Sequence, residues 1–256
     1  MAQRNSHDDS RRKFLKATAG LATGITGLSL LPGLLSAAPA TGNGRNADGL
    51  LPGSTLENTA FPAWTAGAGP VMPLADDDMN IIGPREGYSP QIGTLVSMMT
   101  WMRTVMLYSS KGMTVEQLDF LLDNKANTIG SMLFHLAATD AFYHEHTFNG
   151  TAWGKWDKSL EEKFGVAMEL GDAGRKQIKG HNLDFYTSLL QETREKTLAE
   201  FKKRDDKWLL AADKDWPWGP TNNYCKWFHV CEHESNHNGQ IKFLKSRLPG
   251  AKASGE

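Results

Sequence analysis

The stretch NYCKWFHVCEHESNHNGQIKFLKSR, residues 223–247, decides the fold that the sequence predicts. At about 100° per residue, its apolar side chains and two of its histidines fall on one stripe. The stripe consists of Val230, His233, His237, Ile241, Leu244 and, just beyond the stretch, Leu248. The pattern predicts a long helix that packs into a core through this face. His233 and His237 lie one turn apart on it, close enough to bind one metal ion together.

Three earlier segments also repeat apolar residues at helical spacing. The first helix is expected after Pro90, on the residues Ile92, Leu95, Val96, Met99, Met102 and Met106. A second helix is expected over residues 128–147 and a third over residues 182–203. Between the first and the second, Thr114 and Gln117 have the spacing of a capping box.

No segment alternates as a half-buried strand would, so the sequence predicts an all-α fold, an up-down four-helix bundle. The connections between helices two and three and between helices three and four are longer than usual and rich in tryptophan. They contain Trp153, Trp156 and the stretch DKDWPWGPT, residues 213–221. We expect both connections to be long aromatic-rich loops that cover one end of the bundle.

The first forty residues resemble an export signal. A basic segment, SRRKFLK from Ser10 to Lys16, precedes a weakly apolar run that ends in small residues at Ala38 and Ala40. Paired arginines followed by Phe14 and Leu15 are typical of a twin-arginine signal. Residues 1–40 are therefore predicted to be a cleaved signal peptide read by the twin-arginine export machinery. The mature chain would be periplasmic or secreted, with anchoring to the inner membrane by an uncleaved signal as the alternative.

The rest of the chain divides by composition. Residues 41–87 are rich in Gly, Pro, Ala and Asn and predict a linker or N-terminal arm. Residues 88–250 hold the predicted bundle, and residues 251–256 read as a disordered tail. The formal net charge is −1, and five of the basic residues lie in the signal segment. Because no stripe of Lys and Arg alternates with aromatic residues, nucleic-acid binding is disfavoured.

The sequence does not decide whether its two cysteines, Cys225 and Cys231, form a disulfide. Six residues along a continuous helix place their side chains about 120° apart, which is poor geometry for a bond. An exported chain could nevertheless oxidise them if Cys225 precedes the helix.

A third histidine is expected to face the same core. His135 shares a helix face with Met132, Ala138, Thr139 and Phe142. Three imidazoles in an apolar bundle are costly unless something ligates them or bonds to them. His135, His233 and His237 are therefore the candidate ligands of one divalent metal ion, Zn²⁺, Ni²⁺ or Fe²⁺, with open positions for water or substrate.

The remaining histidines are assigned other places. His144 and His146 lie near a helix end and are expected at the surface, where the helix dipole favours them. His181 is expected at the start of the third helix, and His7 belongs to the signal segment.

The letters H-E-S-N-H, residues 233–237, match the H-E-x-x-H pattern of zinc proteases. Those enzymes take a third ligand from downstream, and in the extended pattern Gly and His occupy the positions that here hold Gln240 and Phe243. A protease is therefore the less favoured interpretation. Glu234 and Gln240 flank the inward stripe, and either could orient a ligand imidazole. Glu234 could also act as a base and is the candidate catalytic residue.

Three segments resemble the DinB-like superfamily, in its DinB/DUF664 branch. They are NIIGPREGYSPQIGTLVSMMTWMR, KANTIGSMLFHLAATDAFY and EHESNHNGQIKFLKSRLPG, and the similarity spans residues 80–250. Its most specific elements are H-x-x-x-H followed by a Gly-Gln pair, and a single histidine in the second helix. Asn238 stands where relatives often have arginine. The resemblance implies an up-down four-helix bundle with one divalent metal, commonly zinc or nickel, on His135, His233 and His237.

Characterised members of that superfamily include S-transferases and isomerases that use mycothiol or bacillithiol, and some metal-dependent hydrolases. Together with the predicted export signal, the resemblance thus implies an exported, metal-dependent transferase or hydrolase acting on a small molecule that the sequence does not identify. Two other classes stay open: a structural or binding protein whose metal only staples the helices, and a partner-binding module that uses the tryptophan-rich loops. A homodimer also stays open.

Overall fold

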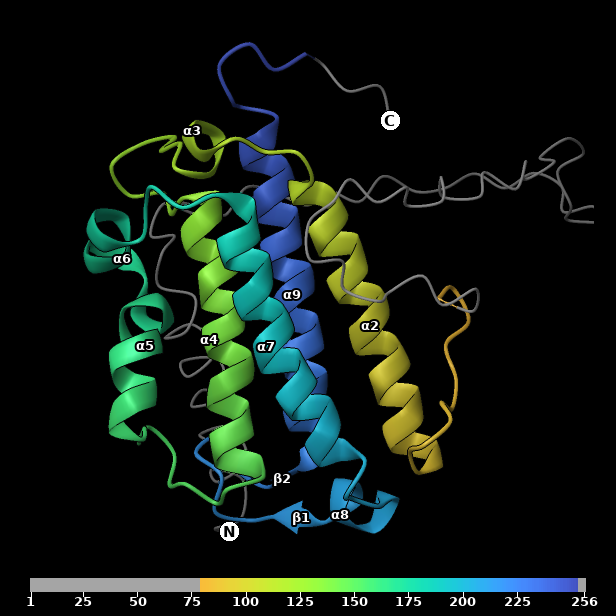
Figure 1. The fold of residues 1–256 in the computed structure, drawn as a ribbon. Coiled ribbons are helices and arrows are strands. Elements are labelled where there is room, and N and C mark those ends of the chain that lie inside the picture. The colour runs from red at the N-terminus through yellow and green to blue at the C-terminus, as the bar shows by residue number, and fades with distance from the viewer. Residues whose placement is uncertain (1–78, 253–256) are drawn as a thin grey trace, which may run out of the picture.

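The computed structural model describes residues 79–252. The predicted signal segment and residues 41–78 of the predicted linker lie outside the described residues, as do the last four residues of the predicted tail. Four long helices form the body of the molecule (Figure 1). They are α2 (Pro90–Ser110), α4 (Ile129–Thr147), α7 (Leu183–Phe201) and α9 (Asn223–Lys245). The predicted four-helix bundle is confirmed, and the bounds predicted for the second, third and fourth helices lie within two residues of those observed.

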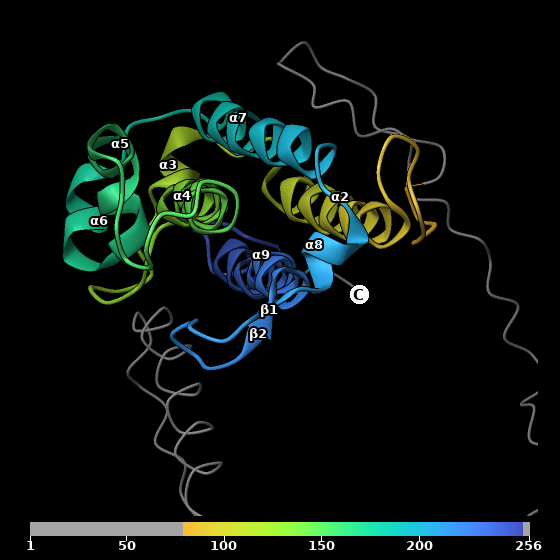
Figure 2. The same cartoon turned by 90° about the horizontal axis from the view of Figure 1, so that it is seen from below.

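The order of the helices around the bundle determines which side chains meet in its centre. Seen along the axis, α4 lies between α7 and α9, and α2 packs against α9 and α7 (Figure 2). The connection between α4 and α7 carries the chain back along the outside of the bundle, so that α4 and α7 run in the same direction (Figure 1). The strict up-down alternation that the sequence predicts therefore does not hold for these two consecutive helices. In contrast, α4 and α9 run antiparallel, and this pair carries the candidate metal ligands.

Local side-chain caps explain where three of these helices begin. Thr128 precedes α4 and accepts from the Ser131 amide at 3.0 Å. Asn182 caps α7 in the same way, and Asn222 caps α9 by accepting from the Cys225 amide at 2.9 Å. Such caps satisfy amides that have no partner inside the helix. Each cap is a polar residue directly before the first residue of its helix.

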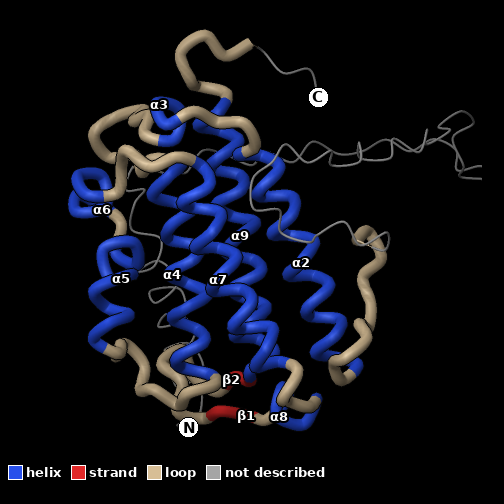
Figure 3. Tube along the Cα trace, viewed as in Figure 1, coloured by secondary structure: helices blue, strands red, loops and turns tan. Residues whose placement is uncertain are grey.

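The connections are more ordered than the loops that the sequence predicts (Figure 3). Between α2 and α4 lies α3 (Val115–Leu118), which begins with the predicted capping box of Thr114 and Gln117. Two helices, α5 (Lys158–Glu169) and α6 (Gly171–Gln177), lie between α4 and α7. The last connection contains α8 (Asp206–Leu210) and two short antiparallel strands, β1 (Ala212–Asp213) and β2 (Thr221–Asn222), in which Ala212 pairs with Asn222.

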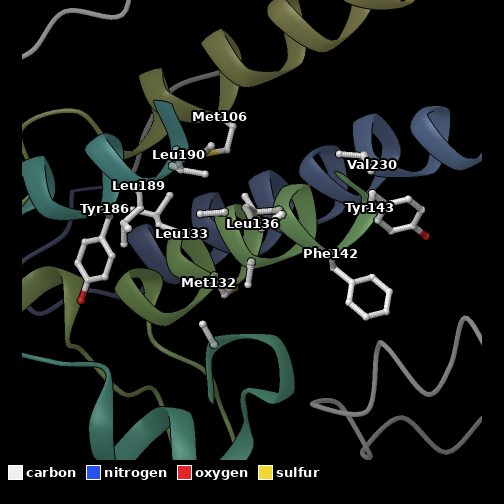
Figure 4. Packing of buried hydrophobic residues seen from close by; sticks show 14 of the residues in the cluster. Met106, Met132, Leu133, Leu136, Phe142, Tyr143, Tyr186, Leu189, Leu190 and Val230 are labelled. Carbon is white, nitrogen blue, oxygen red and sulfur yellow. The ribbon is translucent and has the colours of Figure 1, made fainter. Parts of the chain in front are cut away.

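The apolar core lies between the four helices. Leu133 and Leu136 of α4, Leu190 of α7 and Val230 of α9 all belong to this core and are buried (Figure 4). A second group of packed side chains is aromatic and is formed at the end of the bundle where the connections meet. It includes Phe142, Trp153, Trp216, Trp227 and Phe148. The tryptophan-rich connections therefore cover one end of the bundle, as predicted.

Helix α9 is buried on more than the predicted stripe. Cys231 and Asn238 lie outside the predicted stripe, but both are buried, because α9 packs between α2 and α4. Cys231 and Cys225 are both free thiols, the first buried and the second exposed. Among residues 79–252, no helix is both long and apolar enough to cross a membrane.

Candidate metal centre

The structure brings the three predicted ligands together. His135 comes from α4, and His233 and His237 come from one face of α9. Their candidate ligand atoms all lie within 4.8 Å of one another, and all three residues are buried. The Nε2 atoms of His135 and His233 are 2.9 Å apart, and those of His237 and His233 are 3.2 Å apart. Three imidazole nitrogens thus converge on one point in the bundle.

The opposite ring nitrogens of two of these histidines are anchored. His135 Nδ1 donates to the carbonyl oxygen of Ala167 at 2.9 Å. His237 Nδ1 faces Oε1 of Gln240 at 3.1 Å and donates to it. A carbonyl oxygen can only accept, so in the neutral ring the hydrogen sits on Nδ1 and Nε2 carries a lone pair. This arrangement also fixes the orientation of each ring, as partners of metal-bound histidines do.

These tautomers leave a surplus of lone pairs that a cation would satisfy. The Nε2 lone pairs of His135 and His237 both face Nε2 of His233, which can donate at most one hydrogen. Zinc–nitrogen bonds of about 2.0–2.1 Å in a tetrahedral site place two ligand nitrogens about 3.3 Å apart, close to the observed spacing. The donor set therefore fits one divalent ion with three histidine ligands.

Burial keeps the three imidazoles neutral. It lowers the pKa of His135 to about 4, against two opposing backbone contacts. Burial, together with the nearby His135 ring, lowers the pKa of His237 to about 3. The pKa of His233 lies well below its ordinary value because of burial and the three neighbouring imidazoles. At neutral pH all three rings are in the unprotonated form that metal ions require.

Glu234 lies in a buried cluster of charges. Its Oε1 accepts from Arg103 Nε of α2 at 2.9 Å and from Arg194 Nη2 of α7 at 2.7 Å. Asp140 of α4 completes the cluster, accepting from Arg194 Nε at 2.8 Å and from Arg103 Nη2 at 3.3 Å. No side chain of the four is more than 4% exposed. Glu234 thus ties α9 to α2 and α7, and of the two flanking residues it is Gln240 that bonds to a ligand imidazole.

The sequence reasoning missed Arg103, Asp140 and Arg194. Each lies among apolar residues on a helix face, and two positive charges and one negative charge in such positions are a signal that could have been read. It also missed the Ala167 carbonyl, which comes from α5. A backbone group in a segment expected to be a loop leaves no such signal.

Two histidines outside the ligand set differ in their surroundings. His146 was expected at the surface but is buried, because the connection after α4 folds back over it. Its Nδ1 donates to the Thr151 carbonyl at 2.7 Å, and its ring packs against Phe142 and Trp153. His229 is half-buried and lies beside the metal centre, and burial lowers its pKa.

A family model described as Mycothiol-S-transferase matches residues 94–250. The chain belongs to this family. The match covers more than half of the chain and includes all three histidines of the cluster. A search of curated proteins found no match. The S-transferase description agrees with the resemblance that the sequence motifs carry, and the cluster of buried histidines supports a metal site of the kind that resemblance implies.

Proposed function

We propose that the protein is a divalent-metal-dependent transferase that activates a small thiol at His135, His233 and His237. The observation that carries the proposal is the convergence of three neutral, buried imidazole nitrogens, two of them anchored through their opposite ring atoms. Membership of the mycothiol-S-transferase family supports a thiol as the nucleophile.

The residues of the site have distinct parts in this proposal. His135, His233 and His237 would hold the ion, and three protein ligands leave coordination positions open to substrate. A bound divalent ion would lower the pKa of a coordinated thiol or water and so supply a nucleophile at neutral pH. Ala167 and Gln240 hold the His135 and His237 rings in place, and the apolar core around the rings limits the access of water.

Elemental analysis tests the site. Purified protein is expected to contain about one divalent ion per chain, and the double variant His135→Ala, His233→Ala is expected to contain none. His181→Ala, which alters a histidine outside the cluster, is the matched control and should keep its metal. A wild-type protein without metal after expression in metal-replete medium would contradict the proposal.

Removing the ion separates an enzyme from a metal-stapled structural protein. A chelated protein that keeps its helical circular dichroism but no longer transfers a thiol to a chromogenic aryl halide supports catalysis. If the protein unfolds when its metal is chelated, the metal has a structural role. Activity that survives replacement of all three histidines would instead point to a partner-binding module that uses the tryptophan-rich connections.

We further propose that the twin-arginine export machinery exports the protein, because Arg11 and Arg12 precede an apolar run that ends in small residues. Low-molecular-weight thiols are largely cytoplasmic, so an exported enzyme would need a thiol present outside. Cell fractionation of the wild type and of the Arg11→Lys, Arg12→Lys variant tests export. A variant that leaves the cytoplasm as efficiently as the wild type contradicts it.

A further inference from the structure

His229 is a fourth imidazole at the edge of the metal centre. It lies one turn before His233 on α9, and the two ring centroids are 5.7 Å apart with a tilt of 31°. Among the described residues, the histidines placed to bind a metal ion together are His135, His233 and His237, and His229 is not one of them. It is half-buried, so its ring borders the centre while part of it stays accessible to a small molecule.

A buried tyrosine fixes the state of this ring. The hydroxyl oxygen of Tyr143, on α4, lies 2.9 Å from His229 Nδ1. Tyr143 is 1% exposed, and burial raises the pKa of its hydroxyl, so the hydroxyl keeps its hydrogen. Within residues 79–252 this hydroxyl has no other hydrogen-bond partner. A buried hydroxyl hydrogen without an acceptor is costly, so Tyr143 donates to Nδ1 and the hydrogen of His229 sits on Nε2.

Aromatic packing holds this pair in place. Trp218, from the connection between β1 and β2, packs against His229 with ring centroids 5.3 Å apart. Tyr143 lies near Trp227 and Trp216, at centroid distances of 6.1 and 6.5 Å. Across the described part of the chain, no hydrogen bond engages His229 Nε2. The arrangement thus presents an oriented N–H donor next to the histidine cluster.

We propose that His229 is a substrate-binding residue whose Nε2–H donates a hydrogen bond to an oxygen of the thiol held at the three-histidine centre. The inference rests on the proposed function, and it makes a carbonyl or carboxylate oxygen near the sulfur the group of the thiol that His229 recognises. Tyr143 is a positioning residue, which acts by fixing the tautomer and orientation of His229. A thiol with an oxygen in this position would accept the hydrogen bond from His229 Nε2, whereas a simple alkyl thiol offers no acceptor.

Thiol binding to the cobalt-substituted protein tests the contact. Each variant is loaded with Co²⁺, and the sulfur-to-cobalt charge-transfer band is followed while N-acetylcysteine or ethanethiol is added. The Kd for N-acetylcysteine is expected to rise about tenfold in His229→Leu and to return towards the wild-type value in His229→Gln, which keeps a donor. The Kd for ethanethiol, which has no oxygen, should be the same in all three proteins.

The outcomes separate this inference from the proposed function. If the wild type shows the band but His229→Leu binds N-acetylcysteine as tightly, the inference is overturned and thiol activation stands. If the wild type binds cobalt but shows no band with either thiol, the proposed thiol chemistry fails, and this inference with it.

Nitrogen NMR of the zinc-loaded protein tests the tautomer without any substrate. We expect the His229 hydrogen on Nε2 in the wild type, and a mixture of tautomers in Tyr143→Phe, which removes the hydroxyl that fixes the ring. A hydrogen on Nδ1 in the wild type would overturn the inference, since Nε2 would then have nothing to donate.

Discussion

At the scale of single residues, the metal centre depends on which atom holds the far side of each imidazole. His135 is held by a backbone carbonyl, which no side-chain substitution removes, whereas His237 is held by the side chain of Gln240. The two anchors are therefore unequal targets for mutation. Only the contact between Gln240 and His237 can be removed by substituting a side chain.

Replacing Gln240 by leucine is expected to weaken metal binding about tenfold, because partners that orient ligand histidines contribute on that order to affinity. His237 would lose the acceptor that keeps its hydrogen on Nδ1 and its lone pair on Nε2. Competition with a chromogenic chelator measures the metal affinity. Gln240→Glu, which retains an acceptor oxygen, is the control and should bind metal at least as tightly as the wild type. Equal affinity in Gln240→Leu would show that the contact does not support the site.

At the scale of the helices, the buried charges of Arg103, Asp140, Arg194 and Glu234 connect all four members of the bundle. Removing one partner from such a cluster leaves an opposite charge buried and uncompensated. Thr197 adds a hydroxyl that donates to Asp140 Oδ1 at 2.7 Å. The cluster therefore makes the packing of the helices sensitive to single substitutions.

Glu234→Gln is expected to lower the free energy of unfolding by about 3 kcal/mol or more, because both arginines lose their charged acceptor. Metal content should stay at about one ion per chain, since Glu234 bonds to the arginines. Urea unfolding and elemental analysis measure the two effects. Glu232→Gln, an exposed change on the same helix, should have an effect within about 0.5 kcal/mol. Loss of catalysis in Glu234→Gln with unchanged stability would instead support the base role that the sequence suggested.

The close approach of α4 and α7 depends on a glycine. A Cβ built at Gly130 would lie 2.7 Å from the hydroxyl oxygen of Tyr186, a buried residue of α7. Gly130→Ala is therefore expected to destabilise the protein by about 1–3 kcal/mol through overpacking. Gly239→Ala on α9 is the matched control: its Cβ meets nothing within 4 Å, so better helix propensity should stabilise the protein by about 0.5–1 kcal/mol. Thermal unfolding compares the two variants, and equal melting temperatures would contradict the packing argument.

The long helices could be predicted from the sequence because their signals are local. Apolar periodicity marks the buried face of each, and Thr128, Asn182 and Asn222 mark where three of them begin. The capping box of Thr114 and Gln117 marked the start of α3, but the other helices of the connections could not be predicted. Helix α5 starts in the charged run 158–163 and buries only Phe164, Ala167 and Met168, which is too short a pattern to read.

The positions of the histidines could likewise be predicted only where a single helix determines them. The pair His233 and His237 could be predicted because one turn of helix places them on one face. The surroundings of His146 could not, because its burial depends on Trp153, a residue of the folded-back connection that no helical pattern places. Long-range contacts of this kind are set by tertiary packing, which the periodicity of a single helix does not report.

At the scale of the whole molecule, the buried histidines couple stability to pH. In six of the histidines in residues 79–252, burial is the largest cause of a lowered pKa: His135, His144, His146, His229, His233 and His237. In the unfolded chain these rings take up protons near pH 6.5. The folded protein binds fewer protons than the unfolded chain below that pH, so its stability falls as pH falls.

The metal-free protein is therefore expected to lose stability between pH 7 and pH 5, a range in which few carboxylates titrate. With a folded pKa of about 4 against 6.5 in the unfolded chain, His135 alone contributes a loss of about 2 kcal/mol by pH 5. Urea unfolding of the chelated protein at both pH values measures the change. His135→Gln removes one of the titrating rings and should show a smaller loss over the same range. An unfolding free energy that is equal at pH 7 and pH 5 would mean that these imidazoles can take up protons in the folded protein. In that case burial would not account for the neutral rings of the metal centre.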